Sequence, residues 1–314
     1  MPGTTPTFAV EADRLSKRYR STVAVDEVTL PVAAGEIFGI LGRNGAGKTT
    51  AVELIAGLRR PDRGTVRVLG LDPRRDRARV RQVLGVQLQN SHLHSALTVT
   101  ELVRLYRTFY RAPVPTAELI ESVGLTGSRD TRFDTLSGGQ QQRLSVALAL
   151  VGRPRVVILD ELTTGLDPEA RRQIWTTVEG LRASGVTVLL VSHAMEEVER
   201  LCDRVALLEA GRIVALDSPA GLVRRAGLAQ RVTFRAAAPI PEGLLEGLAE
   251  VERVRAESGR VVVEGHGDLL QAVSVALVRA GVVVTETRGE RATLDDAFVA
   301  LTGRRITNDE EAPR

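Results

Sequence analysis

Residues 42–49 follow the apolar run Glu36–Leu41 and form the stretch Gly42-Arg43-Asn44-Gly45-Ala46-Gly47-Lys48-Thr49. This stretch matches the pattern G-x-x-x-x-G-K-[ST] in full. Its glycines let backbone N–H groups approach phosphate oxygens, and a helix from about Gly47 to Leu58 would point its positive end at the same anion. A glycine-rich turn before a helix is the alternative. Only two lysines occur in the chain, so a chance match is expected about once in a thousand sequences.

The phosphate-loop pattern assigns roles to individual side chains. We expect Lys48 to reach the β- and γ-phosphates of a nucleotide and the Thr49 hydroxyl to hold Mg²⁺. The residues expected to bind the nucleotide around this loop are Gly42, Asn44, Gly45, Ala46, Gly47, Lys48, Thr49 and Thr50.

An acidic pair follows a second apolar run, Val156–Leu159, which is typical of a buried parallel strand. A carboxylate at the end of such a strand needs a polar partner. Metal-bound water would suit Asp160, which is therefore predicted as a second Mg²⁺ anchor. The next residue, Glu161, is placed to orient and deprotonate an attacking water. An exposed acidic pair after a core strand is the alternative.

A third motif lies between these two, in the sequence Leu136-Ser137-Gly138-Gly139-Gln140. Ser137 and Gln140 have the spacing of a capping box, which predicts a helix start with free N–H groups. The two glycines leave that helix end bare, as an anion site requires. Because the chain already has one phosphate loop, a second anion site suggests a γ-phosphate held by another copy. A glycine-containing helix cap is the alternative.

Apolar runs alternate with helical patterns over most of the chain, which predicts an α/β fold with a mainly parallel sheet. Strand-like runs occur at Phe8–Leu15, Val23–Val32, Thr65–Val68 and Val186–Val191, and helical spacing occurs at Thr98–Arg111. After residues 219–226 the pattern changes to the β-α-β-β-α-β order of a ferredoxin-like unit. Its expected strands are 231–235, 251–256, 260–264 and 282–288, its helices are 242–249 and 268–280, and a short helix, 294–301, follows.

Composition excludes several classes of protein. The net charge is +3 with scattered arginines, so a nucleic-acid-binding stripe is not expected. One cysteine, Cys202, rules out an internal disulfide and fits a reducing compartment. No apolar run reaches about 18 residues, so no membrane span is expected. No signal peptide is evident at the start.

Together, the three motifs resemble the nucleotide-binding subunit of an ATP-binding-cassette (ABC) transporter over roughly residues 8–220. The resemblance implies a P-loop NTPase cassette: a RecA-like core with a mainly parallel sheet, an antiparallel β-subdomain and an α-helical subdomain. It implies ATP and Mg²⁺ as cofactors and a second copy of the chain as partner in an ATP-sandwich dimer. Residues 227–303 would form an accessory α+β domain that stabilises the dimer or regulates it, and residues 304–314 a disordered tail.

The same resemblance implies roles for residues outside the three motifs. Tyr19 would stack on adenine, although it could also be an ordinary strand tyrosine. Gln89 would contact Mg²⁺ and the lytic water, with Gln87 as the competing choice. Asp167, in Thr164-Gly165-Leu166-Asp167, would cross the dimer. His193 would contact the γ-phosphate. Leu162 departs from the family, which usually has proline there, and this could loosen Glu161 slightly.

A cassette without membrane spans implies a separate integral membrane permease and a peripheral location on the cytoplasmic face of the cell membrane. The stretch Gln89–Arg111 gathers Tyr106, Phe109 and Tyr110 and is expected to form part of the groove that receives a cytoplasmic helix of the permease. Internal packing of the helical subdomain is the alternative for Tyr106 and Phe109.

The end of the chain, Thr293–Gly303, is similar to endings in bacterial exporter ATPases of the daunorubicin-resistance kind. It implies export of a hydrophobic drug or lipid-like compound. An importer subunit remains an alternative, because the nucleotide chemistry is the same in both directions. So does an ABC ATPase acting on ribosomes or nucleic acid, although the chain lacks the second cassette, coiled coil or zinc module usual in those proteins.

Overall fold

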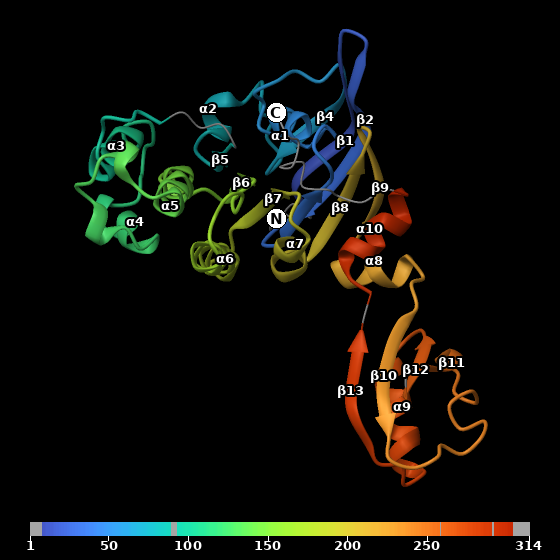
Figure 1. Cartoon of the computed structure of the whole chain (residues 1–314). Coiled ribbons are helices and arrows are strands. Elements are labelled where there is room, and N and C mark those ends of the chain that lie inside the picture. Colours follow the sequence, from blue (N-terminus) through green and yellow to red (C-terminus); the bar gives the residue numbers. More distant parts are fainter. Residues whose placement is uncertain (1–7, 89–92, 258, 291, 304–314) are drawn as a thin grey trace, which may run out of the picture. The chain divides into compact units, whose positions relative to one another are not determined.

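The computed structural model describes residues 8–88, 93–257, 259–290 and 292–303 (Figure 1). The contacts divide the described chain into two units, and the division falls between Pro219 and Ala220. Residues 304–314, expected to form a disordered tail, lie outside the described residues.

A six-stranded sheet forms the centre of the first unit. Its strands, in spatial order, are β5 (Leu84–Gln87), β6 (Val156–Asp160), β7 (Thr187–Ser192), β3 (Ile37–Leu41), β8 (Arg204–Glu209) and β9 (Arg212–Asp217). The first five strands run parallel and β9 pairs antiparallel with β8. Every residue of β3, β6 and β7 is buried, as expected for strands covered on both faces. The mainly parallel sheet predicted from the sequence is confirmed.

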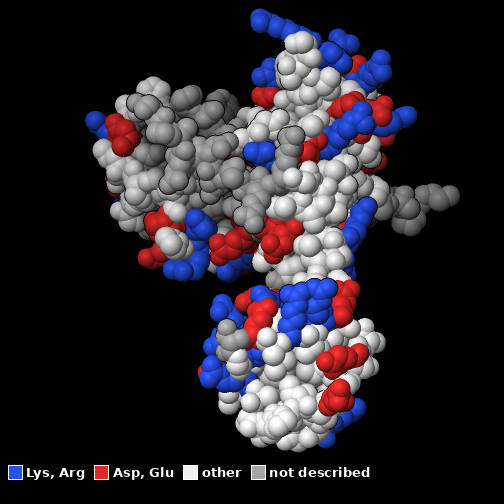
Figure 2. Space-filling view, turned by 45° about the vertical axis from the view of Figure 1, so that its right-hand side comes forward, with Lys and Arg blue, Asp and Glu red and all other residues white. Residues whose placement is uncertain are grey.

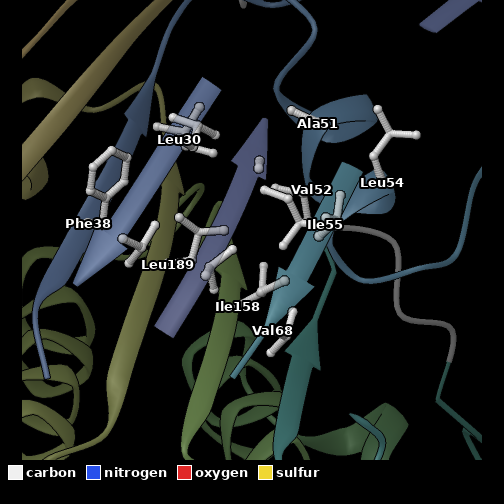
Figure 3. Packing of buried hydrophobic residues seen from close by; sticks show 14 of the residues in the cluster. Leu30, Phe38, Ala51, Val52, Leu54, Ile55, Val68, Ile158 and Leu189 are labelled. Carbon is white, nitrogen blue, oxygen red and sulfur yellow. The ribbon is translucent and has the colours of Figure 1, made fainter. Parts of the chain in front are cut away.

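A second, antiparallel sheet in the same unit has the order β2 (Thr22–Ala33), β1 (Phe8–Tyr19) and β4 (Arg63–Val68). Helix α1 (Lys48–Ile55) buries Val52 and Ile55 in a core shared with both sheets. Figure 3 shows these side chains together with Leu30 of β2 and Ile158 of β6. Burying a side chain of this size stabilises the fold by roughly 1.5–3 kcal/mol. The core therefore holds α1 against both sheets.

Helices pack beside β5, at one edge of the parallel sheet (Figure 1). There α3 (Val99–Arg107), α4 (Thr116–Ser122) and α5 (Gly138–Leu150) contact one another, and α5 also contacts β5. The helix expected over 98–111 ends at Arg107. Three more helices of the first unit are α2 (Arg77–Val80), α6 (Pro168–Ala183) and α7 (Met195–Leu201). The parallel core, the antiparallel sheet and the helical group of the first unit are the three parts that the sequence resemblance implied.

The second unit contains a four-stranded antiparallel sheet. Its spatial order is β11 (Val251–Glu257), β12 (Arg260–Gly265), β10 (Gln230–Ala236) and β13 (Val284–Glu290). Helix α9 (Leu269–Arg279) packs Val273 and Leu277 against Phe234 of the sheet. Two short helices, α8 (Pro219–Arg225) and α10 (Leu294–Thr302), flank these elements in the sequence. The strand order 2-3-1-4 is that of a ferredoxin-like unit.

The helix predicted at 242–249 is wrong, because this segment forms consecutive turns. Gly243 has φ +76°, which an α-helix does not allow. Local hydrogen bonds close the turns, such as that from the Gly247 N–H to the Gly243 carbonyl at 3.0 Å. Leu245 is still buried, so the helix-like spacing of its leucines arises from turns that cover the core.

The sheet face away from α9 carries charged side chains. Val232 and Phe234 of β10 point into the core, so Arg231 and Arg235, which flank them in the strand, point to the other face. Arg231 pairs with Glu257 of β11 at 3.3 Å, and Arg235 and Arg260 both pair with Glu286 of β13. Figure 2 shows side chains of both signs together on this unit.

Candidate active site

The phosphate loop joins β3 to α1, and two of its glycines occupy positions that leave no room for a Cβ. A Cβ on Gly47 would lie 2.1 Å from the Ala24 carbonyl oxygen, and one on Gly42 would lie 2.3 Å from the Leu208 carbonyl oxygen. Gly47 also has φ +104°, in the region that favours glycine. Close packing from two other strands therefore sets the shape of the loop.

Lys48 folds back over the loop that precedes it. Its Nζ donates to the carbonyl oxygens of Gly42 at 2.8 Å and Arg43 at 3.0 Å, and the side chain is buried. Burial lowers the pKa of Lys48, while the negative charges of Glu161 and Asp160 raise it. The cation is thus held between the loop and the acidic pair, where a triphosphate would bind. Thr49, Asn44 and Gly45 are exposed at the same end of α1, whereas Thr50 is half-buried and Ala46 is buried.

The acidic pair lies at the carboxyl end of β6. Asp160 is 1% exposed, and its backbone N–H donates to Oε1 of Gln87 on β5 at 3.0 Å. Glu161 has φ +51°, and its backbone N–H donates to the Val191 carbonyl at 2.9 Å. Leu162, where the sequence resemblance led us to expect a proline, is fully buried, so packing holds the turn that follows.

Of the two glutamines considered for contact with Mg²⁺ and the lytic water, the structure describes only Gln87. Gln89 lies outside the described residues. Gln87 is 4% exposed, and its amide connects β5 to β6 through the Asp160 backbone. This hydrogen bond between the two strands was not predicted from the sequence. The signal for it was a polar residue at a buried position of a parallel strand.

His193 follows β7 and faces the acidic pair. Its Nδ1 lies 3.3 Å from Oε1 of Glu161, and the two side chains are 22% and 9% exposed. Sequence reasoning placed the two residues in one site, and the structure brings them into contact.

The predicted helix start at Ser137 is confirmed, since Ser137 caps α5. Its Oγ accepts from the Gln140 N–H at 3.3 Å, and its own N–H donates to the Gln140 Oε1 at 2.9 Å. Ser137 and Gly138 are exposed, and a Cβ on Gly138 would meet no atom within 4 Å. The first turn of α5 is therefore open to an approaching anion.

Asp167 lies next to this helix start. It caps α6 by accepting from the backbone N–H groups of Glu169 and Ala170, both at 2.9 Å. Hydrogen bonds from Ala170 and Glu169 lower the pKa of Asp167. A Cβ on Gly139 would lie 2.9 Å from the Cβ of Ala170, so the starts of α5 and α6 are in close contact.

Tyr19 ends β1 and is 36% exposed. The Lys17 ammonium lies 5.6 Å and the Arg59 guanidinium 5.5 Å from the centre of its ring. Arg59 also forms an ion pair with Glu53 of α1. Through Arg59, Tyr19 is therefore connected to the helix that follows the phosphate loop. The exposed ring suits a stacked base.

A groove lies beside β5, where the sequence predicted a docking site. Its cavity of about 470 Å³ is lined by apolar side chains and by Arg77 and Arg81. Phe109 and Tyr110 also line it, and Phe109 is 64% exposed. Tyr106 contacts the Phe109 ring edge-on at 5.9 Å. No helix within the described ranges is long and apolar enough to cross a membrane.

Known proteins resemble the chain along nearly its whole length. The ABC transporter family model matches residues 25–164. The Nod factor export ATP-binding protein I of Paraburkholderia xenovorans is 37% identical and covers 96% of this chain and 99% of its own. The daunorubicin resistance ATP-binding protein DrrA2 of Streptomyces coeruleorubidus is 35% identical over 96% and 98%.

Solved structures match the cassette. The ATP-binding subunit of an ABC transporter aligns with a TM-score of 0.64 at 28% identity, over 70% of this chain and 93% of its own. A dimeric ATP-binding cassette in a post-hydrolysis state, bound to ADP and Pi, aligns with a TM-score of 0.61 at 26% identity, over 67% and 98%. The chain thus belongs to the ABC transporter family, as an ATP-binding subunit with ATPase activity.

Proposed function

We propose that the chain hydrolyses ATP at two equivalent sites formed between two copies, and that this energises a separate membrane permease. The observation that carries the proposal is the contact of Glu161 with His193, at the end of the sheet where the negative charges of Asp160 and Glu161 reach Lys48. This arrangement supplies a cation for the phosphates, a carboxylate for a water and an imidazole to hold that carboxylate.

Mg²⁺ is the cofactor proposed beside ATP. The buried carboxylate of Asp160 and the exposed hydroxyl of Thr49 fit a hard cation that takes oxygen ligands, and Gln89 would complete the protein's contribution. Within the described ranges no cluster of three or more acidic, histidine or cysteine residues could hold a metal. Mg²⁺ in nucleotide sites usually has few protein ligands and neutralises phosphate charge.

The proposed catalytic roles follow from position. Glu161 orients the attacking water and accepts its proton. His193 holds the Glu161 carboxylate through Nδ1 and contacts the γ-phosphate. Lys48 and the N–H groups of the phosphate loop balance the phosphate charge, and Tyr19 stacks on adenine.

The second copy would complete each site. The start of α5 would offer the backbone N–H groups of Gly138 and Gly139 to the partner's γ-phosphate, beside the side chains of Ser137 and Gln140, and the adjacent Asp167 would cross the same interface. Support comes from the solved cassette structure that is itself dimeric.

The permease would dock in the groove beside β5, with Phe109 as the exposed anchor. Arg77 and Arg81 favour a permease helix with acidic residues. In this arrangement the chain would lie on the cytoplasmic face of the membrane. The cassette would occupy residues 8–220, and residues 227–303 would form an accessory domain that supports the dimer.

Export of a hydrophobic drug or lipid-like compound is the direction that the relatives favour, since two of them are named for Nod factor export and daunorubicin resistance. To test this, the chain is co-expressed with the multi-span protein encoded beside it. Inside-out vesicles should accumulate a fluorescent hydrophobic drug or lipid when given ATP. Efflux from such vesicles would indicate an importer, and recovery of the chain with ribosomal RNA or DNA would contradict the permease partner.

A further inference from the structure

Glu197 is a buried carboxyl group that none of the proposed catalytic roles uses. It lies on α7, four residues after His193, and is 1% exposed. Burial raises the pKa of Glu197, while the nearby hydroxyls of Ser192 and Thr163 and the N–H of Trp175 lower it. Its Oε1 accepts a hydrogen bond from Trp175, whereas its Oε2 has no partner within hydrogen-bonding distance among the described residues, so burying this group destabilises the fold. Its neighbours therefore indicate what it does.

Those neighbours come from three separate segments of the active site. The Nε1–H of Trp175 on α6 donates to the Glu197 Oε1 at 3.3 Å. The Thr163 hydroxyl lies beside the same carboxyl group and belongs to the segment that runs from Glu161 to Asp167. The Ser192 hydroxyl also lies beside it, at the end of β7 and directly before His193.

Ser192 has a second contact that fixes the turn carrying His193. Its Oγ accepts from the Ala194 N–H at 3.0 Å, so its own O–H remains available to the Glu197 carboxyl. Trp175 is buried as well, and the Arg200 guanidinium lies 4.9 Å from its ring centre. The group around Glu197 is thus packed from both α6 and α7.

We propose that Glu197 is a positioning residue, which fixes Glu161 and His193 relative to α6, the helix that Asp167 caps. Through it, a shift of α6 when the second copy binds at Asp167 reaches the turn after β6 and the turn after β7 together. The inference rests on the proposed roles of Glu161, His193 and Asp167. What it adds is a physical connection through which binding of the second copy would change the positions of Glu161 and His193.

Kinetic measurements on variants distinguish a positioning role of Glu197 from a role in core stability alone. Glu197→Ala should lower kcat by about 10-fold to 100-fold, because small misplacements of reacting groups have effects of this size. KM for ATP should stay within about 2-fold, since Lys48 and Tyr19 are not disturbed. Glu197→Gln should recover most of kcat, because its amide can both accept from Trp175 and donate to the two hydroxyls.

Thr187→Val is the matched control. Thr187 is buried on the same strand as Ser192 but at its other end, where its Oγ1 accepts from the Gly35 N–H at 2.9 Å. This variant should lower the melting temperature and leave kcat at the parent value. If Glu197→Ala retains the parent kcat, the proposal is wrong. It is also wrong if kcat falls in Glu197→Ala and Thr187→Val alike, in proportion to their melting temperatures.

Milder variants cover the case in which Glu197→Ala does not fold. Thr163→Val and Ser192→Ala each remove one hydroxyl beside the carboxyl group, and each should lower kcat with KM unchanged. Parent kcat in both would overturn the proposal. A parent chain with no ATP turnover, by contrast, would contradict the proposed function itself.

Trp175 supplies a direct spectroscopic readout, because it is the single tryptophan of the chain. In a Glu161→Gln background, ATP should change the Trp175 emission as the dimer closes. Glu197→Ala should abolish that change, and Glu197→Gln and Thr187→Val should retain it. Emission that ATP leaves unchanged in the background chain, or that still changes in Glu197→Ala, would overturn the coupling.

Discussion

The imidazole of His193 and the carboxylate of Glu161 lie 3.3 Å apart, although 32 residues separate them in the sequence. Each follows a buried parallel strand, β6 or β7, and the two strands are neighbours in the sheet. The carboxyl ends of such strands form the edge where α/β proteins bind ligands. The contact therefore follows from strand order, and the roles of both residues can be tested separately.

Replacing Glu161 by glutamine should abolish turnover while ATP still binds. The loss of the base is expected to lower the rate by about 10³, or about 4 kcal/mol of barrier. The amide oxygen keeps its contact with His193, so the ATP-bound dimer should accumulate and be visible by size-exclusion chromatography. Glu196→Gln, which changes an exposed carboxylate on α7, is the control and should behave as the parent. Parent rates in Glu161→Gln would refute the assignment of the base.

Replacing His193 by alanine should lower kcat and leave ATP affinity nearly intact, because Lys48 and the phosphate loop remain. ATP turnover and nucleotide binding are measured on the same preparation. His266→Ala serves for comparison, since His266 is an exposed residue that pairs with Glu252 at 2.8 Å. Equal activity of the two variants would show that His193 has no part in the reaction.

Replacing Ser137 by arginine should leave nucleotide binding by the monomer intact and abolish turnover, because the new side chain blocks the partner's phosphate. The substitution also removes the cap of α5, an effect of about 1 kcal/mol. Thr98→Arg removes the same kind of capping box from α3 and controls for that loss. If Ser137→Arg hydrolyses ATP as fast as Thr98→Arg, the site is not shared between two copies.

Two glycine substitutions should have opposite outcomes. Gly47→Ala would place a Cβ 2.1 Å from the Ala24 carbonyl oxygen, so the phosphate loop should deform and ATP binding should be lost. Gly180→Ala in α6 meets no atom within 4 Å and should raise stability by roughly 0.5–1 kcal/mol. Nucleotide titration and thermal melting test the pair. Normal ATP affinity in Gly47→Ala would contradict the close packing around the loop.

Replacing Phe109 by aspartate should weaken binding of the permease and leave the ATPase activity of the isolated subunit unchanged. The charge would enter the apolar part of the groove, where an exposed phenylalanine now offers contact area. Leu105→Asp changes an exposed apolar residue on α3 and provides the comparison. Co-purification with the permease is the measurement. Equal recovery of both variants would place the docking site elsewhere.

The sequence predicted the parts of the fold in which motif and periodicity agree. The capping box at Ser137 and the carboxylate at the end of β6 are local patterns with one structural solution each. The segment 242–249 has helical leucine spacing together with Gly243 and Gly247, and propensity alone could not show which would prevail.

The buried polar contacts of Glu197 and Gln87 could not be predicted from the sequence. Glu197 follows Glu196 in a short helix, and in the sequence both resemble solvent-exposed charges. Only the tertiary packing of α6 and α7 shows that one is buried and the other exposed. Gln87 is a similar case, because its amide is needed by a backbone group on a strand distant in sequence.

The charged face of the second unit bears on how the molecule avoids unwanted assembly. Strands β11 and β13 are the two outer strands of their sheet, and an outer strand leaves backbone groups that a foreign strand could pair with. Here Glu257 of β11 and Glu286 of β13 each form an ion pair with an arginine of an inner strand, Arg231 of β10 and Arg260 of β12, respectively. Substituting them with apolar residues should favour pairing of these outer strands with strands of other chains, so we expect the charges to oppose aggregation.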